Sequence, residues 1–228
     1  MNTFRDTGFV IAILLLLVSC GQEKEKTGDS SSLPIYSPMS VEQKEVGGKV
    51  VQDTVYDTID EFAFLNQDST LVTNKTVDGK IYVADFFFTS CTTICPKMKK
   101  QMVRIYDEYK DNPQVALLSF SIDPEYDTVG LLNDYAASLG VSSGTWHFLT
   151  GEKEKIYEIG QGSFRVTAKE DKQSRDGFLH SGAFTLIDKE GRIRGYYDGT
   201  VEEEVTKLIE DMARLLSEYG PATKSDQA

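Results

Sequence analysis

The sequence predicts an α/β fold, in which strands buried on both faces alternate with amphipathic helices. Two short, apolar, β-favouring runs, residues 81–88 and 115–122, have the pattern of such strands. The stretch between them carries apolar residues at helical spacing, and so does the stretch near the carboxyl terminus. This order of elements predicts a central mixed sheet with helices on both faces.

The chain is long enough for one ordinary domain and some additional polypeptide. It has 228 residues, of which 40% are hydrophobic and 26% are charged, as in globular proteins. Lys and Arg together number 24 and Asp and Glu number 36, so the net charge is −12. Because such a charge repels polyanions, we do not expect nucleic acid as a partner.

The amino terminus resembles a bacterial lipoprotein signal. The apolar run at residues 9–18 is shorter than the roughly 20 residues that a membrane span needs, and it ends at Ser-Cys-Gly, residues 19–21. We therefore expect a signal peptide at residues 1–19 and lipidation of Cys20, which predicts a domain held on a membrane and facing the periplasm or extracytoplasmic space. An ordinary secretory signal, or an uncleaved anchor, is the alternative.

The regions on either side of the domain are poor in large apolar side chains. Residues 20–49, which start at the lipidated cysteine, are rich in Glu, Lys, Ser, Gly and Pro, so we expect a flexible tether there. Residues 220–228 are expected to be a disordered tail. The folded domain is therefore predicted at residues 50–219.

The remaining elements follow in chain order. A hairpin is expected from residues 57–65 and 71–72, ahead of the first buried strand. Pro96 is suited to the first turn of the next helix. Five of that helix's residues share one face and are expected in the core: Met98, Met102, Ile105, Tyr106 and Tyr109.

Two helices and a hairpin are expected after the second buried strand. The helices fit residues 128–139, closed by Gly140, and residues 152–159. Residues 183–188 and 192–197 flank a Lys-Glu-Gly turn, in which the glycine suits a left-handed backbone conformation.

The last helix is the most regular of the chain. Thr200 and Glu203 have the spacing of a capping box at its start. Seven of its apolar residues share one face: Val201, Val205, Leu208, Ile209, Met212, Leu215 and Leu216.

Cys91 and Cys95 lie between the strand at residues 81–88 and the helix that follows. Open α/β sheets usually place sites at this end of a strand. The free amides and the positive dipole end of a helix start favour thiolate, the form that attacks disulfides and binds metals, so we expect activated sulfurs. A static disulfide, or two small core residues, is the structural alternative, although closing so short a ring strains the backbone.

Four motifs in one order resemble the SCO/SenC family of copper chaperones. The resemblance runs from about residue 57 to residue 216. It implies a thioredoxin-like three-layer α/β/α fold with a central mixed sheet, an insertion before the His180 loop and an N-terminal extension. The motifs are residues 85–96 with Cys-x-x-x-Cys-Pro, residues 121–128 (Ser-Ile-Asp-Pro-Glu-Tyr-Asp-Thr), residues 146–151 (Trp-His-Phe-Leu-Thr-Gly) and residues 179–181 (Leu-His-Ser).

The same resemblance implies a copper site made by Cys91, Cys95 and His180, holding one ion, Cu(I) or Cu(II), per chain. Family members are implicated in delivering copper to, or preparing the cysteines of, the binuclear copper centre of cytochrome c oxidase. The expected partner is therefore that copper-site subunit or another exported copper protein. Two thiolates and an imidazole suit three-coordinate Cu(I), whereas zinc normally takes a fourth ligand. Four residues apart on a helical turn, the two sulfurs would face one ion.

The two histidines of the chain receive different interpretations. His180 lies in a loop with glycines, which let the backbone approach closely, and thioredoxins carry a cis proline near this point where this chain has none. The missing proline leaves room for a ligand. His147, beside Trp146 in an expected strand, is interpreted as an ordinary core residue.

Asp85 interrupts the apolar strand six positions before Cys91. Thioredoxins hold a buried acid at this offset that moves protons during disulfide exchange, so Asp85 is a candidate proton acceptor. A buried carboxylate is costly unless it is paired. The alternative is that it faces a lysine or a loop amide at the sheet's edge. Asp123, which precedes a proline, is interpreted as part of a structural turn.

The leading hypothesis is a metallochaperone, which turns over no substrate covalently. The alternative from another class is a thiol-disulfide oxidoreductase, in which Cys91 attacks a partner disulfide and Cys95 resolves it. A peroxidase is the third hypothesis, but the arginine and proline pattern of peroxiredoxins does not appear around Cys91.

Overall fold

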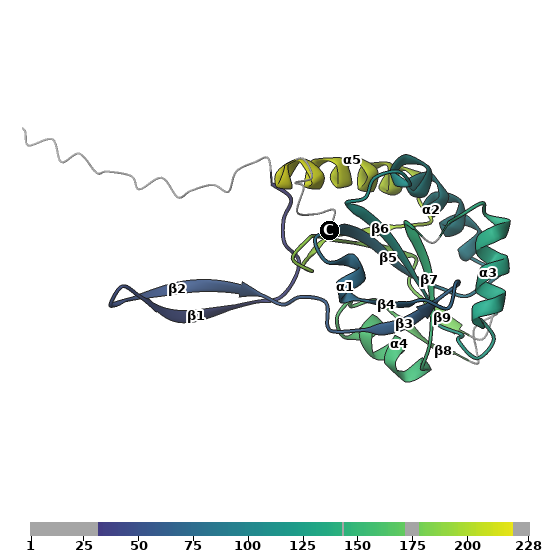
Figure 1. Cartoon of the computed structure of the whole chain (residues 1–228), viewed down its shortest axis with the longest axis horizontal. Helices are drawn as coiled ribbons and strands as arrows, with labels where there is room; N and C mark the ends of the chain where they lie inside the picture. The colour runs from purple at the N-terminus through teal and green to yellow at the C-terminus, as the bar shows by residue number, and fades with distance from the viewer. Residues whose placement is uncertain (1–31, 143, 172–177, 221–228) are drawn as a thin grey trace, which may run out of the picture. The chain divides into compact units, whose positions relative to one another are not determined.

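The computed structural model describes residues 32–142, 144–171 and 178–220. Its centre is a mixed seven-stranded sheet in the order β11-β10-β5-β6-β7-β3-β4, with helices around it (Figure 1). The strands of this sheet are β3 (Ala63–Asn66), β4 (Leu71–Thr73), β5 (Ile81–Phe87), β6 (Val115–Ser121), β7 (Trp146–Thr150), β10 (Ala183–Ile187) and β11 (Ile193–Asp198). The helices are α1 (Asn74–Val77), α2 (Cys95–Tyr109), α3 (Val129–Ser138), α4 (Lys153–Gln161) and α5 (Glu202–Tyr219).

The two strands predicted to be buried lie side by side in the middle of the sheet. Every residue of β5 and β6 is buried. The strands are parallel, from Ile81 opposite Val115 to Phe87 opposite Ser121, and β7 continues the parallel set. Because parallel strands end at the same edge of a sheet, the loops after β5 and β6 are brought together there.

Side chains alternate between the two faces of β5, and each face has its own helices. Phe87 packs on Tyr135 of α3, with 5.6 Å between ring centroids, and α2 lies beside α5, since the Tyr109 hydroxyl donates to the Ile209 carbonyl over 3.0 Å. Phe86 points the other way and stacks on Phe120 at 5.0 Å, next to α4. The structure thus has the expected three-layer α/β/α arrangement of a thioredoxin-like fold.

Most predicted elements are confirmed within a few residues. All five apolar residues predicted on one face of α2 are buried. Gly140, which follows α3, has a φ of +67°, and Gly191, in the β10–β11 turn, has a φ of +78°. The hairpin expected ahead of the main strand is shorter and begins later, because β3 starts only at Ala63.

The capping box predicted for the last helix is wrong. The residue that precedes α5 is Val201, which has no side chain to cap the helix. Thr200 lies one position too early, and its hydroxyl donates instead to Asp198 Oδ1 over 2.6 Å. Glu202, Glu203 and Glu204 fill the first turn, where their charge complements the helix dipole.

The folded domain begins before residue 50. The expectation of a tether at residues 20–49 is therefore wrong for residues 32–49, the part of it that the structure describes. Leu33 is only 6% exposed. Buried Arg194 donates to the Leu33 carbonyl over 2.6 Å and to the Pro34 carbonyl over 3.2 Å. Glu218 of α5 accepts from the Leu33 amide over 2.6 Å, and Ser37 accepts from the Ile193 amide over 2.9 Å. Residues 32–38 therefore belong to the folded domain.

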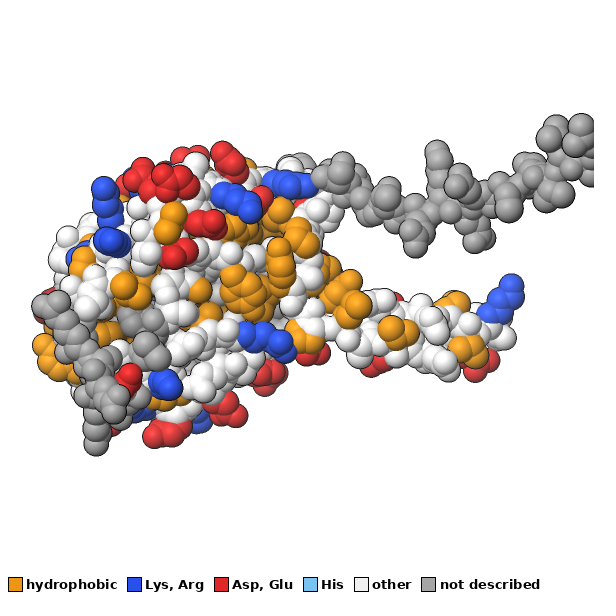
Figure 2. Space-filling model, turned by 180° about the vertical axis from the view of Figure 1, so that it is seen from behind, with side chains coloured by type: hydrophobic (Ala, Val, Ile, Leu, Met, Phe, Trp, Pro, Cys, Tyr) orange, Lys and Arg blue, Asp and Glu red, His pale blue; other side chains and the backbone are white. Residues whose placement is uncertain are grey.

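The next stretch forms a hairpin, whose first strand and turn lie where the flexible tether was expected. β1 (Met39–Val46) and β2 (Lys49–Tyr56) pair antiparallel, with Met39 opposite Tyr56 and Val46 opposite Lys49. Gly47 and Gly48 form its two-residue turn with φ values of +61° and +76°, as a type I′ turn requires. β1 is exposed along its whole length, and Figure 2 shows apolar side chains among polar ones along this hairpin.

A second ribbon lies between α4 and β10, where an insertion was expected. Strands β8 (Ala168–Glu170) and β9 (Phe178–His180) pair antiparallel. The expected signal peptide at residues 1–19, the lipidated Cys20 and all but the first residue of the expected tail at 220–228 lie outside the described residues. Within the described ranges, no helix combines the length and the apolar character that crossing a bilayer requires.

The contacts of residues 32–38 generate a prediction about stability. Without this segment, Arg194 keeps its charge but loses buried acceptors, so a chain that starts at Met39 should be about 2–4 kcal/mol less stable than one that starts at Ser32. Urea unfolding followed by fluorescence of the single tryptophan measures this. As a control, Val41→Ser on the exposed hairpin should change the free energy of unfolding by less than about 0.5 kcal/mol. Equal stability of the two chains would contradict the assignment.

Candidate metal centre

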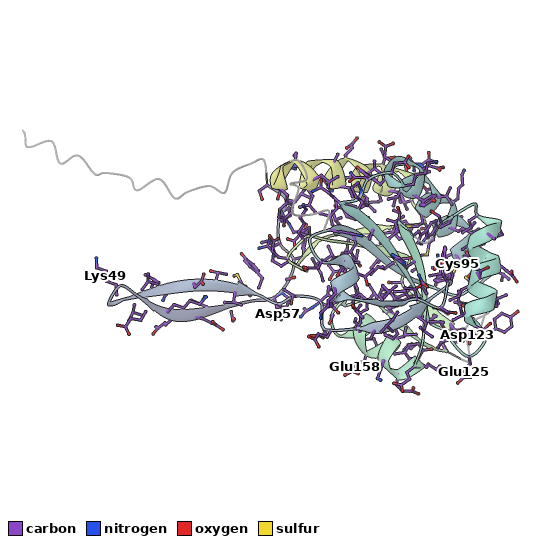
Figure 3. The ribbon with its side chains drawn as sticks, in the orientation of Figure 1. Lys49, Asp57, Cys95, Asp123, Glu125 and Glu158 are labelled. Atoms are coloured by element: carbon purple, nitrogen blue, oxygen red, sulfur yellow. The ribbon has the colours of Figure 1, made fainter. Side chains whose placement is uncertain are left out.

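Cys91 and Cys95 lie where the central strand β5 gives way to helix α2. Cys91 is in the loop, with its amide hydrogen-bonded to the Phe88 carbonyl over 3.3 Å, and Cys95 is the first residue of the helix. Both side chains are buried, at 8% and 6% exposure, and neither is in a disulfide bond. Figure 3 shows Cys95 near the start of α2, well away from Lys49 at the hairpin turn.

The two thiols interact directly. The pKa of Cys95 is raised well above its ordinary value, first by a side-chain hydrogen bond with Cys91 and then by burial, which disfavours the thiolate. Cys91 Sγ also lies 3.6 Å from the Thr93 hydroxyl oxygen. The two sulfurs therefore lie close together, although Cys91 is in the loop and not on the helical turn that we expected.

One expectation about this pair is wrong for Cys95. We expected the start of the helix to lower the pKa and activate the sulfur. The hydrogen bond with Cys91 and burial outweigh that effect, so the neutral thiol is the favoured form of Cys95 in the metal-free chain.

The segment that carries His180 crosses the cysteine loop. His180 is the last residue of β9 and pairs with Ala168 of β8. On one side of it, the ring of Phe178 lies 4.9 Å from the ring of Phe88. On the other side, a Cβ on Gly182 would be 3.8 Å from Cδ1 of Ile94, so the backbone comes close to the residue just before Cys95.

The predicted third ligand is the imidazole of His180. For His180 only the backbone is described, so the convergence of its imidazole with the sulfurs stays a prediction. Among the side chains that the structure describes, no three His, Cys, Asp or Glu residues gather closely enough to hold a metal ion. The Ser181 hydroxyl, next to His180, is buried without a hydrogen-bond partner among the described residues.

Asp85 is buried beneath the cysteine pair. It is 5% exposed and accepts a hydrogen bond from the Ser119 hydroxyl, which in turn accepts one from the Trp146 indole over 2.9 Å. A cavity of about 10 Å³, close to the smallest volume that holds a water, is lined by Asp85, Cys95 and Tyr135 among others. Lys99 lines the same cavity, so a lysine partner for Asp85 and a proton role both stay predictions.

Sequence reasoning missed the role of Asp127. This carboxylate is fully buried and accepts hydrogen bonds from the Thr89 amide over 3.1 Å, from the Thr89 hydroxyl, and from the Ser121 hydroxyl over 2.6 Å. Asp123 instead accepts the Tyr126 and Asp127 amides with its own carbonyl, as expected of a structural turn. The sequence feature that could have indicated this role is the position of Asp127 directly before Thr128, the residue that caps α3.

His147 is a core residue, as predicted. It is 7% exposed, and its Nδ1 lies 3.2 Å from the side-chain amide nitrogen of Asn66. Burial lowers the pKa of His147 to about 4, so the ring is neutral near pH 7. It lies in the middle of β7, on the opposite face of the sheet from Trp146.

Comparison with known proteins places this geometry in a family. Residues 51–217 match the SCO1/SenC family model. A SCO1/SenC family lipoprotein from Bacillus anthracis superposes with a TM-score of 0.63 at 32% identity, over 69% of this chain and 94% of that chain.

Two further solved structures relate the fold to redox and metal chemistry. BsSco, described as a member of the Sco family of cytochrome c oxidase assembly proteins with a disulfide switch, has a TM-score of 0.62 at 32% identity, over 69% of this chain and 92% of that chain. A copper-bound ScoI from Arabidopsis thaliana has a TM-score of 0.57 at 25% identity, over 69% of this chain and 98% of that chain.

The burial of His147 generates a prediction about pH. The unfolded chain protonates this ring below a pH near 6.5, whereas the folded protein protonates it only near pH 4. The contribution of the neutral His147 ring to the free energy of unfolding is therefore fully present above pH 6.5 and is lost as the pH falls toward 4. The loss amounts to about 3 kcal/mol at most.

Urea unfolding at several pH values checks this against His147→Gln, which removes the titrating ring. Between pH 6.5 and pH 4, the unaltered protein should lose more stability than the variant. Parallel curves for the two proteins would show that His147 is not the titrating group.

Proposed function

Because this chain belongs to the SCO1/SenC family, we propose that it binds one copper ion through Cys91, Cys95 and His180 and serves in the assembly of cytochrome c oxidase. It would deliver copper to the binuclear copper centre of the oxidase or prepare the cysteines of that centre. The observation that carries the proposal is the buried pair of hydrogen-bonded thiols at the start of α2, with Phe178 and Gly182, on either side of His180, lying close to the same loop.

The donor set fits Cu(I). Thiolate sulfur is a soft ligand and prefers Cu(I), and an imidazole completes a three-coordinate site. Binding must displace the thiol protons, and the raised pKa of Cys95 makes this costly in the absence of metal. We therefore expect copper affinity to rise with pH as proton release becomes easier. Since the copper is cargo, incoming thiolates of a partner take it over by ligand exchange, and no substrate is turned over.

We place the protein at a membrane surface, outside the cytoplasm. Lipidation of Cys20 is supported by the sequence around it and by the relative from Bacillus anthracis, which is a lipoprotein. Several acyl chains hold a protein on a bilayer far better than one, because each buried methylene contributes about 0.8 kcal/mol. The expected partner is the copper-site subunit of the oxidase or another exported copper protein.

The test of the copper site is a Cu(I) titration of residues 21–228 under reducing conditions, with a chromophoric chelator as competitor. We expect one tight site per chain. Cys91→Ser or Cys95→Ser should abolish tight binding, because one thiolate remains. His180→Ala should weaken binding by at least about 10-fold, because loss of a ligand should cost no less than loss of a hydrogen bond that supports one.

His147→Gln, which changes the other histidine of the chain, is the matched control and should leave the Cu(I) affinity unchanged. Normal affinity in all three ligand variants would end the copper proposal.

A second candidate function is thiol-disulfide exchange, and the position of Asp85 favours it. Asp85 lines the same cavity as Cys95, and its charge contributes to the raised pKa of that thiol. In this reaction Cys91 attacks a partner disulfide, and Cys95 then displaces the partner, so that the partner gains two thiols and the Cys91–Cys95 pair becomes a disulfide. Asp85 would accept the proton that Cys95 loses.

A trapping experiment distinguishes the two functions. If exchange is the function, Cys95→Ser should accumulate a mixed disulfide between Cys91 and the partner, because no resolving thiol remains. Asp85→Asn should slow release of the partner, and His180→Ala should have no effect on exchange. Non-reducing electrophoresis and mass spectrometry measure each species. Failure of Cys95→Ser to trap a disulfide-bonded partner would reject this alternative.

A further inference from the structure

We propose that Asp127 is a positioning residue that holds the loop carrying Cys91 in the geometry that the sulfur pair needs. The inference deepens the proposed function, because it assigns a role toward the cysteine site to a residue outside the ligand set. It rests on hydrogen bonds and burial.

The carboxylate of Asp127 accepts hydrogen bonds from the loop at Thr89, two residues before Cys91. One oxygen, Oδ1, accepts the Thr89 hydroxyl. The other, Oδ2, accepts the Thr89 amide over 3.1 Å and the Ser121 hydroxyl over 2.6 Å. Backbone and side chain of Thr89 are thus both bound to a single group that comes from the β6–α3 loop.

Asp127 is itself held rigidly. Its side chain is fully buried, and its amide donates to the Asp123 carbonyl over 2.8 Å. Ser121, at the end of β6, connects it to the central sheet, and the Ile122 amide donates to the Phe87 carbonyl at the end of β5 over 2.8 Å. Thr89 is therefore connected by hydrogen bonds, through Asp127 and Ser121, to the buried central strands.

The cysteine loop is contacted from two directions. Asp127 holds Thr89, and the segment around His180 packs on Phe88 and comes close to Ile94. Cys91 lies between these contacts in the chain, and its amide donates a hydrogen bond to the Phe88 carbonyl. Loosening Thr89 should therefore let Cys91 move relative to Cys95. Such movement should weaken metal binding, because metal ligands must be held within about 0.5 Å of their productive positions.

A carboxylate is needed, because both oxygens of Asp127 accept hydrogen bonds. In Asp127→Asn the amide nitrogen replaces one oxygen and then faces a donor, so at least one of the bonds to Thr89 or Ser121 is lost. Thr89→Val removes the hydroxyl while keeping the shape and the amide, and it leaves Asp127 in place. Thr89→Ser keeps the hydroxyl and serves as the conservative rescue.

The matched control is Asp188→Asn. Asp188 is also fully buried and binds Arg192 and Arg194. It follows the end of β10 that pairs with Tyr82 near the start of β5, and so lies at the opposite edge of the sheet from the cysteines. Its replacement should destabilise the fold without affecting the site.

The experiment measures the alkylation rate of Cys91 by mass spectrometry in the reduced, metal-free protein, without denaturant. Asp127→Asn and Thr89→Val should raise this rate severalfold, and Thr89→Ser and Asp188→Asn should not. Urea unfolding of each variant confirms that the folded state is the one sampled. In a second arm, the first two variants should weaken Cu(I) binding by about tenfold, as loss of a supporting hydrogen bond does in metal sites.

The proposal is overturned if Asp127→Asn and Asp188→Asn change the alkylation rate equally, because general destabilisation then explains the effect. It is also overturned if neither Asp127→Asn nor Thr89→Val changes the rate. The alkylation measurement uses no copper, so it decides the role of Asp127 even if the unaltered chain binds no Cu(I). That result would reject the proposed function alone.

Discussion

The parallel pairing of β5 with β6 is the constraint on which the site depends. The two strands run in register from Ile81 opposite Val115 to Phe87 opposite Ser121, so they end at the same edge of the sheet. The loop after β5 carries Cys91 and leads to Cys95, and the loop after β6 carries Asp127. Their meeting through Thr89 follows from this register, because a shift of one strand would separate the two loops.

Burial shapes the chemistry of this edge. Two buried carboxylates lie near the sulfur pair: Asp85, which lines a cavity with Cys95, and Asp127, which binds Thr89 in the cysteine loop. The hydrogen bond with Cys91, burial and, to a smaller extent, the charge of Asp85 all disfavour the Cys95 thiolate, which explains the raised pKa of Cys95. A cation compensates such a site better than solvent does, since it neutralises the charge that thiol ionisation creates. The arrangement is therefore suited to holding a metal cation or to transferring protons and electrons in exchange.

The N-terminal region shows how local composition can mislead. Residues 32–38 are held by contacts to Arg194 and Glu218, which lie some 160–185 positions away along the chain. No local pattern contains that information. In contrast, the Gly47-Gly48 turn between valine-containing stretches was a local hairpin signal, outweighed in the sequence interpretation by the polar composition around it. β1 and the turn are therefore ordered where the sequence predicted a tether.

The sequence by itself determined the α/β class, the central strands, most helices and the two cysteines, because these depend on periodicity and on spacing within a few turns of chain. Its motifs also indicated the family, which the match over residues 51–217 shows. Only the tertiary structure placed Asp85 against Ser119, brought Asp127 to Thr89 and packed Phe178, two residues before His180, against Phe88. These features join residues tens of positions apart, and the hydrogen bond with Cys91, together with burial, reversed the thiol activation that the helix start predicts for Cys95. Desolvation and long-range pairing are properties of the packed chain, so no local pattern of residues specifies them.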